Sequence, residues 1–90
     1  MSKSEPMTAL KNIQRFLDDG RGQITIGEIP PIERAALAAE GKKPRVALVC
    51  REGETAAALL ERLDAELGKA MATDTVVDEV LPEINRRRAR

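Results

Sequence analysis

The chain has 90 residues, and its fifteen basic side chains balance fifteen acidic ones, so the formal net charge is zero. This length allows one small domain. Large apolar side chains are scarce and thirteen residues are alanine, which predicts a thin hydrophobic core and a domain of marginal stability.

Several residue types are absent or nearly absent, and this excludes whole classes of site. Without histidine there is no Ser-His-Asp or Cys-His catalysis and no zinc site that uses His. Cys50 is the single cysteine and Phe16 the single aromatic residue, which excludes an internal disulfide and a base-stacking platform. Residues 1–6 lack the apolar stretch of a secretory signal, and no apolar run is long enough to span a membrane. We therefore expect a cytoplasmic protein that is not an enzyme and binds no metal, cofactor or membrane.

The first elements are predicted from the spacing of apolar residues. These recur every three or four positions between Met7 and Leu17, which predicts a helix that stops at Gly20. Isoleucines alternate with polar residues over 23–26, which predicts a short strand with Ile24 and Ile26 on one face.

A second helix and a strand are expected in the middle of the chain. Pro31 suits a first helical turn, alanines follow it, and Gly41 can end the helix, so we predict a helix over 31–40. The continuous apolar run over 45–50 predicts the central strand of the sheet, covered on both faces.

The longest helix is predicted over about 55–71. One apolar stripe runs along it, made of Ala56, Leu59, Leu60, Leu63, Leu67 and Met71. Its charged residues are expected to face water, namely Glu61, Arg62, Asp64 and Glu66.

The last part of the chain allows two readings. Thr75 and Asp78 have the spacing of a helix-start box, and the valines that follow fit a short helix, which Pro82 limits. Valine also favours strands. A sheet of two strands is incomplete, so either this segment or a second chain completes it, and we expect a homodimer.

These elements predict an α+β or small α/β domain of two layers, with three to four helices on a short sheet of two to three strands. We expect residues 1–6 to be a flexible N-terminus, residues 7–83 to form the domain and residues 84–90 to form a basic, flexible tail.

A segment of thirteen residues, from Phe16 to Glu28, resembles the calcium loop of the EF-hand family. In this register Gly22 stands at the invariant sixth position and Glu28 at the bidentate twelfth. The resemblance implies calcium binding through carboxylate oxygens. However, Leu17 stands where the leading carboxylate belongs and Arg21 brings a cation to the fifth position, so two expected ligands are missing. We predict a helix end, a turn and a strand at this place.

Cys50 is the one candidate nucleophile. It ends the apolar strand just before a turn and a helix, where backbone N–H groups and Arg51 can lower the pKa of a thiol. Yet there is no histidine base and no second cysteine, and the position five residues further on that a phosphatase-like loop gives to arginine is Ala56. We expect a cysteine of the core.

Charge is distributed unevenly, and this feature guides the functional prediction. Nine acidic and two basic residues lie between Glu52 and Glu83, whereas the end of the chain carries Arg86, Arg87, Arg88 and Arg90. We predict a small interaction or regulatory protein that binds a protein partner through the acidic, leucine-striped helix, with Glu61, Asp64 and Glu66 as contacts. The alternative is a nucleic-acid-associated protein whose four C-terminal arginines contact phosphates.

Overall fold

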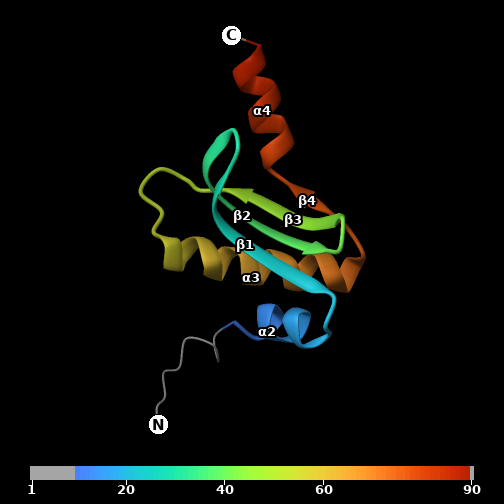
Figure 1. Cartoon of the computed structure of the whole chain (residues 1–90). Helices are drawn as coiled ribbons and strands as arrows, with labels where there is room; N and C mark the ends of the chain where they lie inside the picture. The colour runs from blue at the N-terminus through green and yellow to red at the C-terminus, as the bar shows by residue number, and fades with distance from the viewer. Residues whose placement is uncertain (1–9, 90) are drawn as a thin grey trace.

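A four-stranded sheet and three helices make up residues 10–89, the part of the chain that this computed structural model describes. The strand order is β1-β2-β3-β4, with the first three strands antiparallel and β4 parallel to β3 (Figure 1). In chain order the elements are α2 (Lys11–Asp18), β1 (Gly22–Ile29), β2 (Ile32–Glu40), β3 (Lys43–Val49), α3 (Ala56–Thr73), β4 (Val77–Asp78) and α4 (Val80–Arg88).

This architecture confirms the α+β class and corrects the strand count. The sequence predicted two or three strands, and the sheet has four. The strand over 45–50 and the long helix over 55–71 are confirmed with small shifts of their ends. Residues 1–6 lie outside the described part of the chain.

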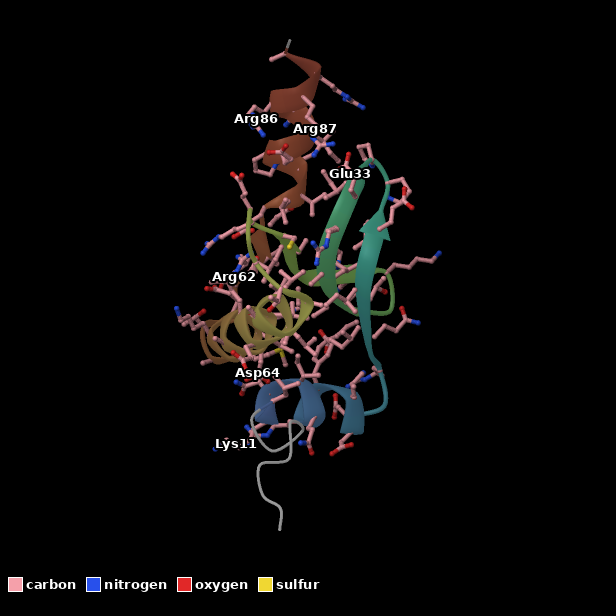
Figure 2. All side chains as sticks on the ribbon, turned by 90° about the vertical axis from the view of Figure 1, so that its left-hand side faces the viewer. Lys11, Glu33, Arg62, Asp64, Arg86 and Arg87 are labelled. Atoms are coloured by element: carbon pink, nitrogen blue, oxygen red, sulfur yellow. The ribbon has the colours of Figure 1, made fainter. Side chains whose placement is uncertain are left out.

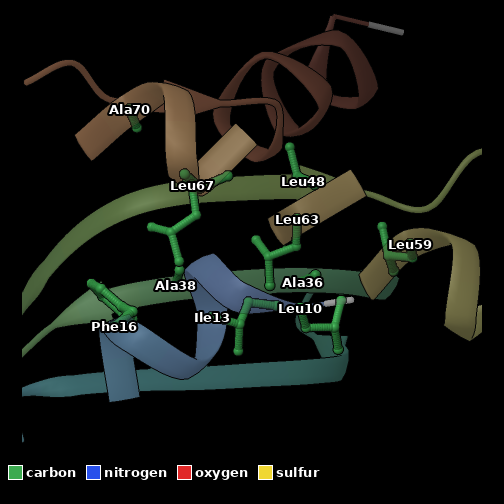
Figure 3. Packing of buried hydrophobic residues seen from close by; sticks show 11 residues of the cluster. Leu10, Ile13, Phe16, Ala36, Ala38, Leu48, Leu59, Leu63, Leu67 and Ala70 are labelled. Carbon is green, nitrogen blue, oxygen red and sulfur yellow. The ribbon is translucent and has the colours of Figure 1, made fainter. Parts of the chain in front are cut away.

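The hydrophobic core lies between the sheet and the two helices α2 and α3 (Figure 3). Three members of the predicted stripe of α3 form the centre of this core, since Leu59, Leu63 and Leu67 are fully buried. Leu60 is half-buried, and Ala56 and Met71 at the two ends of the stripe are exposed, which corrects the prediction for them. Helix α2 adds Ile13 and Phe16, which pack against the same cluster. These three leucines therefore stabilise the domain itself and are not accessible to a partner.

Gly22 permits the close contact between α2 and β1. A Cβ atom at this position would lie 2.6 Å from the Phe16 ring and from the Phe16 carbonyl oxygen. Any larger residue would push the helix away from the strand, because backbone cannot shift as easily as a flexible side chain.

The helix predicted over 31–40 is wrong, because these residues form strand β2. Pro30 and Pro31 make the turn of the hairpin from β1, and Gly41, with a φ of 59°, lies in the turn to β3. The alanines favour a helix in isolation, but here they are buried in a strand with a neighbour on each side. Tertiary packing overrides the local preference because small side chains let other elements approach both faces of the sheet.

The C-terminal segment supplies both a strand and a helix. Residues 77–78 pair with β3, so the chain itself extends the sheet, and the argument for a second chain that completes it no longer holds. The helix starts later than predicted: Asp78 Oδ1 accepts hydrogen bonds from the N–H groups of Val80 and Leu81, at 2.8 and 3.0 Å. Pro82 lies in the first turn, where its missing N–H has no helical partner.

The boundary predicted at residue 84 falls inside α4, which continues to Arg88. The flexibility of 84–90 stays a prediction. Within residues 10–89, none of the helices has the length and apolar character that crossing a membrane requires. The cytoplasmic location stays a prediction.

Replacing Leu63 with Ala is expected to lower the free energy of unfolding by about 2–5 kcal/mol, because Leu63 is fully buried and its removal leaves a cavity. Urea denaturation measures this. The control is Met71→Ala in the same helix, whose side chain is largely exposed and whose removal should cost about 0.5 kcal/mol or less. Similar losses in both variants would contradict the core described here.

Candidate functional site

The three acidic residues predicted as a partner surface differ in their exposure to solvent. Glu61 is exposed, Glu66 is half-buried and 3.9 Å from Lys69, and Asp64 is buried. The prediction that Asp64 faces water is wrong. Partner binding by Glu61 and Glu66 stays a prediction, but the buried Asp64 does not add its charge to such a surface.

Asp64 holds the start of α2 instead (Figure 2). Its Oδ1 accepts a hydrogen bond from the Ile13 N–H at 2.8 Å, and Asn12 Nδ2 donates to the Asp64 backbone and side chain at 3.1 and 3.2 Å. Helix α2 has no side-chain cap of its own, so a carboxylate from another helix satisfies one of its free N–H groups. A sequence pattern could not reveal a cap that comes from 51 residues away.

Two of the C-terminal arginines are already neutralised within the molecule. Arg86 and Arg87 bind Glu83 at 2.7 and 2.9 Å, and Arg87 also binds Glu33 at 3.2 Å (Figure 2). These contacts lower the pKa of Glu83, chiefly through Arg86, and that of Glu33 through Arg87. In the described part of the chain only Arg88 of this group lacks an acidic partner.

Arg90, the fourth arginine of the alternative nucleic-acid site, lies outside the described residues. The helix thus presents fewer free cations than the sequence suggested, although phosphate binding by the tail stays a prediction.

The helix end, turn and strand predicted for the segment that resembles an EF-hand loop are confirmed, since α2 ends at Asp18 and β1 starts at Gly22. The segment that resembles an EF-hand loop continues into strand β1, and no cluster of three or more acidic or cysteine side chains that could hold a metal ion occurs between residues 10 and 89. Cys50 is half-buried at the margin of the core, and its thiol donates to the Glu54 carbonyl oxygen at 3.3 Å.

A cluster of ion pairs centres on Arg62, a residue predicted to face water that is in fact only 14% exposed. Its guanidinium binds Glu54 through two nitrogens at 2.9 and 3.1 Å, Glu79 at 3.0 Å and the Val49 carbonyl oxygen at 2.8 Å. Glu79 in turn accepts from the Val49 N–H at 3.0 Å. The cluster therefore ties α3 to the end of β3 and to the start of α4.

The electrostatics of this cluster fit a structural role. The pKa of the Glu54 carboxyl is lowered to about 2, first by its hydrogen bonds from Arg62, while Glu54 raises the pKa of the Arg62 guanidinium. Both groups are held in their charged forms at neutral pH. A general acid or base needs a pKa near the working pH, so this pair is not tuned for proton transfer.

An apolar groove of about 330 Å³ lies on the side of the sheet opposite to α2 and α3, beside α4. Its lining residues are Ile29, Leu37, Pro44, Ala47, Asp78, Val80, Leu81 and Ile84. Asp78 is the single ionisable residue among them. Leu81 is 55% exposed, which is unusual for a leucine next to other apolar side chains.

A second hollow of about 420 Å³ lies between α2 and α3. Its lining includes Asn12, Arg15 and Asp19 beside Phe16 and Met71. Charged and amide groups at such a rim remain well solvated, so there is less apolar surface for a partner to cover than in the groove beside α4.

The sequence did not reveal this groove. The sequence predicts a helix around Leu37 that does not form. It leaves the segment around Leu81 between helix and strand. The signal that could have found it is the alternation within β2, where Leu37 lies on the opposite face from the core alanines Ala36 and Ala38.

Comparison of the chain with protein-family models, with curated proteins and with solved structures finds no match.

The low pKa of Glu54 predicts a dependence of stability on pH. A carboxyl whose pKa is lowered from 4.5 to about 2 stabilises the fold above pH 4.5, and this contribution is lost as the pH falls towards 2. Urea titrations at several pH values should therefore show a steeper loss over this interval for the wild type than for Glu54→Gln. Glu52→Gln, on the exposed turn nearby, should follow the wild type. Parallel curves for wild type and Glu54→Gln would contradict the ion pair.

Arg62→Met should lower the free energy of unfolding by about 3 kcal/mol, because it leaves Glu54 and Glu79 without their cation in a largely buried place. Lys69→Met is the matched control in the same helix, since the exposed pair of Lys69 with Glu66 contributes about 1 kcal/mol or less. Chemical denaturation measures the free energy of unfolding of both variants. Equal losses would show that the ion pairs of Arg62 stabilise the fold no more than an exposed pair does.

Proposed function

We propose that this chain is a small, non-enzymatic interaction protein that binds a protein partner in the apolar groove between α4 and the face of the sheet opposite to α2 and α3. One observation carries the proposal: Leu81 and Ile84 of α4 and Leu37 of β2 line a groove with a single ionisable residue, Asp78. Interface cores combine apolar anchors with few charges in this way.

The groove also specifies the chemistry of its partner. Its volume of about 330 Å³ and its apolar lining fit a short segment with two or more apolar side chains as anchors. Asp78 places a negative charge at the rim, and the stretch from Glu52 to Glu83 that includes it is strongly acidic. The partner segment should therefore carry a lysine or arginine next to its anchors, because the charges across an interface are complementary.

Two surfaces that the sequence favoured are weaker choices. The leucines of α3 are buried in the core, and Asp64 caps α2. The paired state of Arg86 and Arg87 reduces the positive charge that a nucleic acid would meet. The groove beside α4 is an apolar surface that remains accessible.

The test selects peptides from a displayed random library against the full chain. We expect selected sequences with apolar anchors and a basic residue, and at least about tenfold weaker binding to Leu81→Lys, which corresponds to about 1.4 kcal/mol. Leu17→Lys is the matched control, since Leu17 is 40% exposed but lies on α2. Asp78→Asn, which keeps a capping side chain, should weaken the basic peptides only.

Chemical-shift mapping of the labelled protein with a selected peptide locates the contact. Shifts confined to the groove residues support the proposal. Peptides that bind Leu81→Lys as well as the wild type, or shifts centred on Glu61 or on Arg88, would overturn it.

A further inference from the structure

Strand β1 forms one edge of the sheet, and within residues 10–89 it pairs only with β2 (Figure 1). Its outward side therefore presents backbone N–H and C=O groups to water along eight residues. Such an edge is a template for pairing with another strand.

The first six residues of this edge lack the features that usually prevent such pairing. Residues 22–27 contain no charged side chain and no proline, and their register with β2 is regular up to the irregularity between Gly27 and Ile29. Ile26 is 42% exposed although it shares a face of the strand with Ile24, which packs against the core. A neighbouring strand would cover Ile26.

Charges at the two ends of this flat stretch suggest which strand fits. Arg21 precedes it and Glu28 follows it, both are exposed, and neither makes an ion pair within the described part of the chain. If two copies of β1 pair antiparallel, Arg21 of each copy comes to the end where Glu28 of the other lies. Long side chains reach both opposite and diagonal neighbours across strands, so two reciprocal ion pairs can form.

We propose that two copies of this chain associate through their β1 edges, antiparallel, into one continuous sheet with four strands from each copy. The uncharged stretch supplies the backbone pairing, and the charges at its ends set the direction. This proposal does not rest on the groove beside α4. Of the groove residues only Ile29 belongs to β1, and it lies beyond the uncharged stretch 22–27 that would pair in the dimer.

The experiment measures the mass of the full chain against concentration by analytical ultracentrifugation. The wild type should dimerise, and Arg21→Glu should shift the equilibrium towards monomer by about tenfold or more, because it places two acidic groups side by side at each end. Glu28→Arg should do the same with two basic groups. The double variant Arg21→Glu/Glu28→Arg restores opposite charges and should restore the dimer. Circular dichroism and urea denaturation show whether each variant stays folded.

The outcomes separate this proposal from the previous one. Leu81→Lys should leave the dimer intact. A wild type that stays monomeric at millimolar concentration, single variants that dimerise normally, or a double variant that does not recover would overturn edge pairing. Loss of the dimer in Leu81→Lys with no effect at Arg21 or Glu28 would also overturn it, since the groove would then be the contact.

Discussion

The C-terminal half of this structure depends on the ion pairs and hydrogen bonds that the Arg62 guanidinium makes. It binds Glu54, Glu79 and the Val49 carbonyl oxygen at once, so one side chain of α3 fixes the end of β3 and the junction before α4. Planar, bidentate geometry suits arginine for this role better than lysine. Helix α4 starts directly after Glu79, so the ion pair of Glu79 with Arg62 helps to fix where α4 lies. The position of α4 in turn shapes the groove between this helix and the sheet.

Helix α3 directs two charged side chains, as well as its leucines, towards the interior of the domain. Asp64 caps α2, two residues along the helix from Arg62. With few large apolar side chains, the domain adds these hydrogen-bonded charges to a thin core, and each of them joins elements that are distant in sequence. The consequence for function is that α3 has less free acidic surface than its sequence suggests. The accessible apolar surface lies on the face of the sheet opposite to α2 and α3.

The sequence predicted those parts of the fold whose local pattern and tertiary environment agree. The apolar run at Val46–Val49 predicted a covered strand, and the leucine spacing around Leu63 predicted a core helix, and both predictions are confirmed. The helix predicted for the alanine-rich segment at Ala35–Ala39 is wrong. Alanine prefers helices in isolation, but its small side chain also suits a strand packed on both faces. That error also hid Leu37, and with it the groove.

By itself, the sequence determined that helices and strands mix in one small domain, and it located the long helix with a buried face and one inner strand, because hydrophobic periodicity is a local property of the chain. The choice of α+β over α/β came from the strand pairing. Only the tertiary structure decided where the charged side chains go. Whether Asp64 and Arg62 meet water or a partner depends on groups far away along the chain, at Ile13 and at Glu79. The accessible apolar groove is decided in the same way, since it exists only where residues of the four strands and of α4 come together in space.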